Sequence, residues 1–255
     1  MSIAEKVRNN IGRMKPGTVF MISDLPSYHE EKKATIKAVS YFYKNETFTK
    51  RYGSIKKIAD GLYYKEEEGF FGKLPPSYDA VLHALIFSKN KKVGFVTGPQ
   101  LFNIKGLSTQ VPATTTVVTS KLAPAKIDIF GIKIEVIRKQ KIEEKNIKRH
   151  ELEYILNNLS KIQSIEIEMM HFFFNEYFSW IKNDQKQFDE LYKNLSYKRT
   201  KAVLGALLEE YQLQKKEDIE HYIIKIKEDL STRSKYKIGH LSNLIQKKEK
   251  WNIEF

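Results

Sequence analysis

The chain has 255 residues, of which 41% are hydrophobic and 12% aromatic, a composition that excludes a disordered or fibrous protein and is typical of a globular one. It contains no cysteine, which excludes disulfides, thiolate nucleophiles and zinc–thiolate sites. The formal net charge is +13, and most of it lies in residues 1–75 (14 Lys and Arg against 9 Asp and Glu) and 76–141 (10 against 3), which favours a polyanionic partner for the N-terminal part.

The first elements expected in chain order are a helix, a short strand and a short helix. Residues 2–5 have the form of a capping box, and the apolar residues that follow keep helical spacing until Pro16-Gly17 ends the helix. The run 19–22 is β-branched and aromatic, which predicts a strand. Ser23-Asp24 then offers a helix cap ahead of Leu25-Pro26.

A basic helix is predicted from about Glu30 to Asn45. Ile36, Val39 and Tyr43 fall at i, i+3 and i+7, the spacing of one buried helical face. The other side presents polar and basic residues to solvent or to a ligand. These candidate DNA-binding residues are Lys33, Lys37, Ser40 and Lys44, with Lys32 at the start of the helix.

A basic hairpin is expected directly after this helix. Residues 48–52 alternate as a strand should, Gly53-Ser54 breaks the pattern, and residues 61–64 resume an aromatic strand. The hairpin carries the remaining candidate DNA-binding residues, which are Arg51, Lys56 and Lys57. The order of elements predicts a winged helix-turn-helix, in which the third helix enters a major groove and the hairpin reaches phosphates. The alternative is an ordinary solvated surface, since most lysine-bearing helix faces are only that.

The sequence pattern of alternating strand residues ends after the predicted hairpin. Residues 66–69 read as a charged loop, and Leu74-Pro75-Pro76 marks the expected domain boundary. The expected fold class is α+β and mostly helical, in three parts. They are a winged helix-turn-helix domain in 1–75, a small mixed α/β module in 76–141 and a helical region in 142–255.

Motifs for catalysis are lacking. Neither a phosphate-binding glycine loop nor a nucleophile elbow occurs, and the six histidines are scattered. Glu166, Glu168 and His171 are the candidate metal ligands, but the two glutamates point about 200° apart on a helix. The triplet 172–174 (Phe-Phe-Phe) is expected in the core rather than in a cofactor pocket. We therefore expect no catalytic residue, metal or cofactor, and the absence of a signal peptide or membrane-length apolar stretch predicts a cytoplasmic protein.

The most distinctive stretch of the sequence lies between residues 106 and 113. Gly106 would end a helix and Pro112 would prevent it from continuing, and the polar residues between them offer hydrogen bonds. The stretch is either a structural joint or a recognition loop, and its local chemistry favours the joint. Its residues are Gly106, Leu107, Ser108, Thr109, Gln110, Val111 and Pro112, followed by Ala113.

Several motifs together resemble the AbiEi family of bacterial antitoxins. The resemblance rests on the residues 17–20 (Gly-Thr-Val-Phe) with Ser23-Asp24, on 58–63 (Ile-Ala-Asp-Gly-Leu-Tyr), and on 106–113 with 117–119 (Val-Val-Thr). It extends from Gly17 to about Arg138. Weaker likenesses to longer relatives occur at 204–209, 236–239 and 251–253, and the family often has Arg where this chain has Asp60.

The resemblance implies a type IV toxin–antitoxin system of the kind that takes part in phage defence. In such systems the antitoxin is a transcriptional repressor whose N-terminal winged helix binds double-stranded operator DNA in its own promoter. It counteracts a nucleotidyltransferase-like toxin without forming a stable complex with it. The alternatives are a stand-alone transcriptional regulator, a protein-interaction module whose helical C-terminal part clasps a partner, and a nucleic-acid enzyme that uses Glu166.

Overall fold

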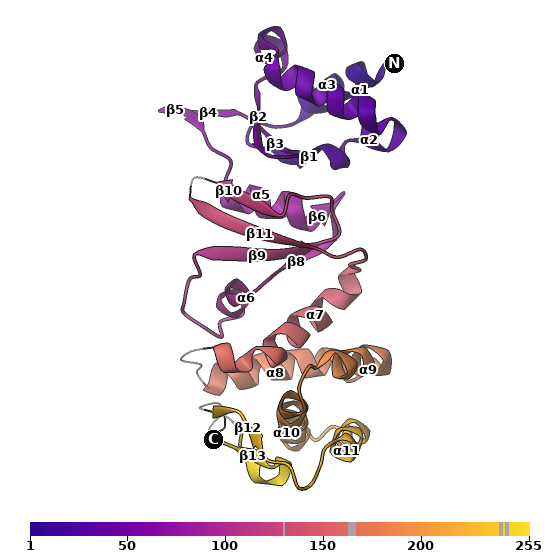
Figure 1. Cartoon of the computed structure of the whole chain (residues 1–255), viewed down its shortest axis with the longest axis vertical. Coiled ribbons are helices and arrows are strands. Elements are labelled where there is room, and N and C mark those ends of the chain that lie inside the picture. Colours follow the sequence, from indigo (N-terminus) through magenta and orange to yellow (C-terminus); the bar gives the residue numbers. More distant parts are fainter. Residues whose placement is uncertain (130, 163–166, 240–241, 243–244) are drawn as a thin grey trace. The chain divides into compact units, whose positions relative to one another are not determined.

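The computed structural model describes residues 1–129, 131–162, 167–239, 242 and 245–255 (Figure 1). The chain divides into two compact units. Unit 1 comprises residues 1–97 and 112–144, and unit 2 comprises residues 98–111 and 145–255. Unit 1 mixes helices with sheets and unit 2 is almost entirely helical, so the chain as a whole is α+β, as expected.

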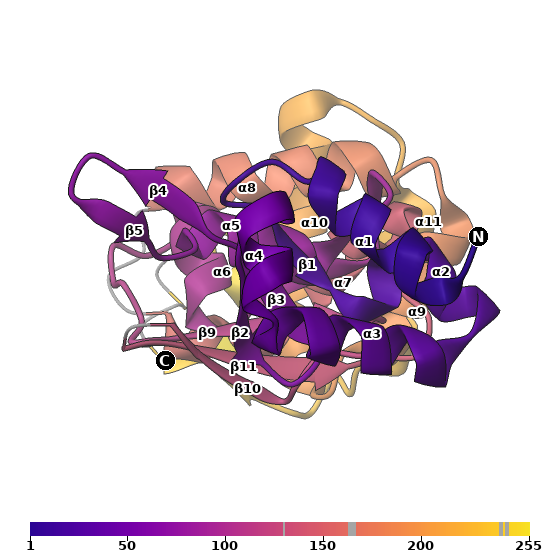
Figure 2. The same ribbon diagram turned by 90° about the horizontal axis from the view of Figure 1, so that it is seen from above.

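The N-terminal half of unit 1 consists of helices packed over a three-stranded antiparallel sheet of order β1-β3-β2. Ser2 caps the first helix, because its hydroxyl accepts a hydrogen bond from the backbone N–H of Glu5 at 3.2 Å. Helices α1 and α3 lie side by side, as Figure 2 shows from above. The elements are α1 (Ile3–Arg13), β1 (Val19–Met21), η1 (Ile22–Asp24), α2 (Pro26–Glu30), α3 (Lys32–Lys44), α4 (Glu46–Tyr52), β2 (Ile55–Ala59) and β3 (Leu62–Lys65).

The buried face of α3 differs from the predicted one. Val39 is fully buried, but Ile36 is 41% exposed and Tyr43 is 37% exposed, so the prediction for these two residues was wrong. The buried residues are Thr35, Ala38, Val39 and Phe42, which share the spacing i, i+3, i+4, i+7. The helix is therefore turned so that a threonine contributes to the core and Ile36 joins the lysines outside.

The segment 48–52 was predicted as a strand and is instead helix α4. Asn45 begins this helix, because its side-chain oxygen accepts a hydrogen bond from the N–H of Phe48 at 2.9 Å. Phe48 then stacks on Phe42 of α3, with ring centroids 4.3 Å apart. The cap and this contact override the alternating pattern. The first hairpin strand is β2 instead, which begins at Ile55.

The rest of unit 1 is built on a four-stranded sheet of order β10-β11-β9-β8, in which β9 and β11 are parallel and the other pairs antiparallel. Its core also contains Met21 of β1 and Leu62 of β3, which pack with Val81, Leu85 and Val117. This shared core joins elements on both sides of the expected boundary at Pro75. The elements are β4 (Glu67–Gly69), β5 (Gly72–Leu74), α5 (Tyr78–Ile86), β6 (Phe87–Ser88), β7 (Lys91–Lys92), β8 (Gly94–Thr97), β9 (Thr114–Thr119), β10 (Lys126–Ile129) and β11 (Ile132–Arg138). Residues 66–69, predicted as a loop, thus include strand β4.

Unit 2 packs its helices around a single aromatic-rich core. Phe173 and Phe174 are buried there, as predicted, whereas Phe172 is 68% exposed. Within the described ranges, none of the helices combines the length and apolar character required to cross a membrane. The elements are α6 (Pro99–Ile104), α7 (Glu144–Asn157), η2 (Leu159–Lys161), α8 (Ile167–Ile181), α9 (Gln185–Asn194), α10 (Lys198–Lys215), α11 (Glu220–Asp229), β12 (Tyr236–Lys237), η4 (Lys248–Trp251) and β13 (Ile253–Glu254).

Candidate functional site

The exposed side of α3 gathers basic, polar and apolar side chains on one surface. Its residues line a shallow groove, and we call them the α3 face. Lys33, Lys37 and Lys44 are exposed, and in the part of the chain that the structure describes none of these three has an ion-pair partner. Their positive charge is therefore available to an external ligand. The α3 face consists of Lys33, Ile36, Lys37, Ser40, Tyr41 and Lys44.

The hairpin β2–β3 brings one further lysine next to the α3 face. Lys57 on β2 lies opposite Tyr63 on β3, and both line a pocket together with Ile36 and Ser40 of the α3 face. The pocket also includes Asp60, whose carboxylate lies 2.5 Å from the ammonium of Lys57. This hydrogen bond and the attraction between the charges raise the pKa of Lys57 and lower the pKa of Asp60.

The predicted hairpin is basic, but its turn carries an acidic residue. Asp60 and Gly61 form the turn, where Gly61 has φ +76°, a conformation that favours glycine. The side chain of Asp60 is 90% exposed. A polyanion that approaches the α3 face would therefore meet a carboxylate beside Lys57, with the same sign of charge as its own phosphates.

Two of the other candidate residues lie away from the α3 face. Arg51 belongs to α4, where its guanidinium lies over the ring of Tyr52, 5.5 Å from the centroid, and it lines a separate pocket with Arg13 of α1. Lys56 precedes Lys57 on β2, so its side chain leaves the strand on the opposite face. The structure therefore brings together Lys57 and the α3 face, but not Arg51 or Lys56.

Lys32 and Lys33 are neighbours with different surroundings. The ammonium of Lys32 lies over the ring of Tyr28 on α2, 5.7 Å from the centroid. Lys32 therefore packs against the preceding helix, in the geometry of a cation–π contact, while Lys33 belongs to the α3 face.

An ion pair between a buried lysine and a half-buried aspartate, which the sequence did not reveal, supports the elements leading into α3. The ammonium of Lys121 lies 2.7 Å from the carboxylate of Asp24, which also accepts a hydrogen bond from the N–H of Met21 at 3.2 Å. Burial lowers the pKa of Lys121, although Asp24 opposes this effect. Because the partners lie far apart in sequence, no local pattern could have identified them.

The hairpin β4–β5 presents two aromatic rings to solvent. Phe70 and Phe71 at its tip are each 97% exposed, and their rings contact each other edge to face with centroids 5.1 Å apart. The adjoining strand β4 carries the exposed Glu67 and Glu68. The sequence signal for this surface is a pair of phenylalanines between Gly69 and Gly72, and the sequence-based predictions made no use of it.

The segment 106–112 has a buried start and an exposed end. Gly106 has φ +70° after the end of α6, and Leu107 is 2% exposed in the core of unit 2. Ser108 accepts hydrogen bonds through its carbonyl from Asn103 at 3.3 Å and through its hydroxyl from the N–H of Gln110 at 3.2 Å. Thr109 and Gln110 are exposed, Val111 is 80% exposed and Pro112 is half-buried.

The candidate metal ligands are not gathered into a cluster that the structure describes. Glu166 lies outside the described residues. Glu168 is exposed, and Nδ1 of His171 lies 3.6 Å from the buried carboxylate of Glu210. Among the described residues, no group of three or more His, Cys, Asp or Glu is placed to hold a metal ion.

Comparison with models of known protein families gives a match. The sequence model of a family described as a family of unknown function (DUF6088) matches residues 6–170. No curated protein and no solved structure matches the chain. The matched range is more than half of the chain and contains the α3 face, the hairpin β2–β3 and the segment 106–112.

Proposed function

The chain belongs to the DUF6088 family, a family of unknown function, and we propose that it binds double-stranded operator DNA through unit 1. The observation that carries this proposal is the α3 face. Three lysines without ion-pair partners among the described residues lie on one exposed side of a single helix, with Lys57 beside them. Phosphate contacts by such lysines supply a large share of the affinity of proteins for duplex DNA.

The order of elements in unit 1 supports a winged helix-turn-helix interpretation. Helix α1 is followed by β1, by the helix pair α2 and α3, and by the hairpin β2–β3, and the sheet order is β1-β3-β2. In this interpretation α3 is the helix that enters the major groove, and the hairpin is the wing. Helix α4 is then an insertion between the recognition helix and the wing.

The chemistry of the α3 face fits a groove as well as a phosphate backbone. Lys37 is placed near the middle of the helix, where it would reach a guanine edge, and the hydroxyl of Ser40 would donate to or accept from a base. Ile36 would offer apolar contact to a thymine methyl group. Lys33 and Lys44 lie toward the two ends of the helix, where phosphates flank the groove.

The resemblance to the AbiEi family supports a more specific role. We propose that the operator lies in the promoter of the protein's own operon, and that the protein is a type IV antitoxin that counteracts a nucleotidyltransferase-like toxin without a stable complex. The segment 106–112 is one of the motifs on which this resemblance rests.

The test is a titration of the full-length protein with its own promoter fragment and with a scrambled fragment, across a salt series. We expect a clear preference for the promoter and a slope of log affinity against log salt of about −0.9 for each neutralised phosphate. Lys37→Ala should cost roughly 1–3 kcal/mol at the promoter if it reads a base. The matched control is Lys91→Ala, an exposed lysine in the separate hairpin β6–β7, which should change neither quantity. Equal weak binding to both fragments, or an unaltered affinity in Lys37→Ala, would contradict the proposal.

A second candidate function is that of a protein-interaction module, and the hairpin β4–β5 favours it. Exposed aromatic pairs such as Phe70 and Phe71 are more common at binding surfaces than elsewhere. Under this alternative a stable stoichiometric complex with a toxin co-purifies, and the double variant Phe70→Ser/Phe71→Ser abolishes it. If the complex is absent or survives the substitutions, this alternative is excluded.

A further inference from the structure

The hairpin β4–β5 of unit 1 ends in an aromatic tip that its own chain leaves uncovered. Phe70 and Phe71 are each 97% exposed, so neither ring packs against the α3 face of the same molecule. Figures 1 and 2 both show the hairpin projecting from one side of unit 1, with α2 on the other side. Burial of the two rings against a partner would remove their apolar surface from water, which stabilises a complex.

The strand that leads to this tip is acidic. Glu67 and Glu68 on β4 are exposed, and neither has an ion-pair partner among the residues that the structure describes. Lys73 on β5 lies opposite Glu68, but it forms its ion pair with Glu66, at 2.9 Å. The hairpin thus combines two apolar rings with two carboxylates that are available to a partner. A complementary surface has exposed apolar side chains with cations beside them.

The α3 face has this complementary chemistry. Its apolar residues Ile36 and Tyr41 are 41% and 61% exposed, and its three lysines lie beside them in the same shallow groove. No Asp or Glu belongs to the α3 face. Asp60 lies next to it but is already paired with Lys57, so this pair adds no net charge. The α3 face can therefore accept both the rings and the carboxylates of the hairpin.

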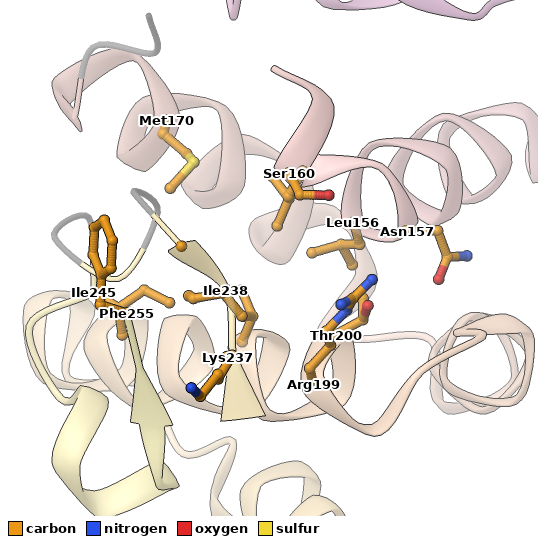
Figure 3. A pocket seen from close by; sticks show the side chains of 13 residues that line it. Leu156, Asn157, Ser160, Met170, Arg199, Thr200, Lys237, Ile238, Ile245 and Phe255 are labelled. Carbon is orange, nitrogen blue, oxygen red and sulfur yellow. The ribbon is translucent and has the colours of Figure 1, made fainter. Parts of the chain in front are cut away.

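A second apolar hollow, in unit 2, fits the hairpin less well. Figure 3 shows Met170, Ile238 and Arg199 among the side chains that line this pocket, to which α7, α10 and β12 contribute. Its apolar residues Leu156, Met170 and Ile238 are at most 8% exposed. A ring that entered would therefore remove less apolar surface of the receptor from water than a ring that covers Ile36 and Tyr41.

We propose that the hairpin β4–β5 of one molecule docks on the α3 face of a second copy of this chain. Phe70 and Phe71 cover the apolar residues of the α3 face, while Glu67 and Glu68 pair with its lysines. The same contact made twice about a twofold axis closes a dimer. A hairpin tip buries less than the roughly 1,200–2,000 Å² of a stable interface, so the association is weak and depends on protein concentration.

The docked hairpin occupies the surface that the proposed operator contact requires. This consequence rests on the proposed function, whereas self-association does not. The carboxylates take the place of DNA phosphates on the lysines, and the rings cover the side chains that would meet the bases. Self-association and promoter binding therefore exclude each other, and the protein's own concentration regulates how many α3 faces are available to DNA.

The test is sedimentation velocity of the full-length protein, without DNA, over a range of protein concentrations. We expect a concentration-dependent shift from monomer toward dimer that weakens as salt is raised, because salt screens exposed charges. Phe70→Ser/Phe71→Ser and Glu67→Gln/Glu68→Gln should each weaken association by about tenfold. Arg199→Gln, in the pocket of unit 2, is the matched control and should leave association unchanged.

Charge reversal tests the pairing itself. Glu67→Lys/Glu68→Lys and Lys33→Glu/Lys37→Glu should each abolish association, because they place like charges opposite each other. A chain with all four substitutions again has opposite charges across the contact and should recover association. All four positions are exposed, and circular dichroism shows whether each variant is folded. Failure of the combined variant to recover would contradict the proposed pairing.

Titration of promoter DNA separates this proposal from operator binding. Phe70→Ser/Phe71→Ser should occupy more promoter than the wild type at concentrations where the wild type self-associates, and the same amount below them. If no variant binds the promoter, operator binding fails while sedimentation still decides self-association. The proposal is overturned by a protein that stays monomeric at every concentration, by association that survives both hairpin variants, or by association that is lost in Arg199→Gln.

Discussion

The ammonium of Lys121 lies 2.7 Å from the carboxylate of Asp24, a residue 97 positions earlier in the chain. The same ammonium donates to the carbonyl oxygen of Ala84 at 2.5 Å and to that of Phe87 at 3.0 Å, at the end of α5. The buried ammonium of Lys121 thus binds carbonyl oxygens at the end of α5 that have no partner within the helix. Through Asp24 it also holds the turn η1, which leads through α2 into α3.

Replacement of this cation should destabilise the protein strongly. Lys121→Met removes the ammonium but keeps most of the side-chain volume, so two carbonyl oxygens and the half-buried carboxylate of Asp24 lose the hydrogen bonds that the ammonium donates. We expect a loss of about 2–3 kcal/mol in the free energy of unfolding, measured in urea. Lys126→Met, at an exposed position on β10, is the control and should change stability by less than about 0.5 kcal/mol. Equal stability of the two variants would show that the pair contributes nothing.

The close contact between Gly205 and Trp251 leads to a second prediction, about the stability of a Gly205 variant. A Cβ atom at Gly205 would lie 2.2 Å from two ring carbons of Trp251, which is 3% exposed. Alanine in a helix normally gains about 1 kcal/mol over glycine, but here the clash should reverse the sign. We expect Gly205→Ala to lower the free energy of unfolding by roughly 1–3 kcal/mol.

The same contact can be tested by rescue. In a Trp251→Leu background the clashing ring is absent, so Gly205→Ala should become neutral or stabilising. Urea unfolding of the wild type, both single variants and the double variant gives the coupling between the two sites. If the two substitutions are additive, the close packing of α10 on η4 at this point is refuted.

The carboxylate of Asp229 makes a third prediction, about pH. Hydrogen bonds from Lys201 at 2.9 Å and Tyr192 at 2.6 Å lower the pKa of Asp229 from 3.8 to about 2. A carboxyl group whose pKa is lower in the folded state stabilises the fold at pH values above its unfolded pKa. This contribution is therefore complete above pH 3.8 and is lost as the pH falls toward 2. Since the side chain is 40% exposed, solvent screening reduces the contribution to about 1 kcal/mol.

Comparison with Asp229→Asn isolates this contribution from those of other carboxyl groups. The variant should be less stable than the wild type at pH 7, and the difference in free energy of unfolding should shrink as the pH is lowered from 4 to 2.5. Glu228→Gln, at the neighbouring exposed position, is the control. A difference that stays constant over this range would mean that Asp229 has no lowered pKa.

How well the sequence predicted each element depended on how local its determinants are. The helix after Ser2 and the lysines of α3 follow from caps and from helical spacing, which involve residues only a few positions apart. The strand predicted at 48–52 failed because Asn45 caps a helix there and Phe48 finds its partner on α3. Such a partner is chosen by tertiary packing, which overrides an alternating pattern of five residues.

In the candidate site, too, the features with local determinants were predicted and those that depend on tertiary packing were not. The exposed lysines of α3 were found from the sequence, but the rotation of the helix that adds Ile36 to the α3 face depends on which side chains fill the core of unit 1. The pairing of Lys57 with Asp60 required the position of the hairpin turn, which was predicted too early in the chain. The ion pair between Lys121 and Asp24 had no local signal at all.

The turn of the hairpin β2–β3 makes a fourth prediction, which concerns DNA. Asp60 holds the ammonium of Lys57 and adds a negative charge beside the α3 face. Asp60→Asn removes this charge and frees Lys57 for a phosphate, so affinity for the promoter should rise several-fold. The slope of log affinity against log salt should become steeper by about one phosphate contact, or roughly 0.9. The change must come from the removed carboxylate, because the raised pKa of Lys57 means that this lysine is already protonated near neutral pH.

Two further variants show whether the hairpin is responsible. Lys57→Gln should weaken binding and make the slope shallower, and in that background Asp60→Asn should lose the part of its effect that passes through Lys57. Glu135→Gln removes an exposed negative charge from β11 and should leave promoter affinity unchanged. An affinity that falls or stays constant in Asp60→Asn would mean that this hairpin does not approach DNA, and contacts would then have to come from the α3 face alone.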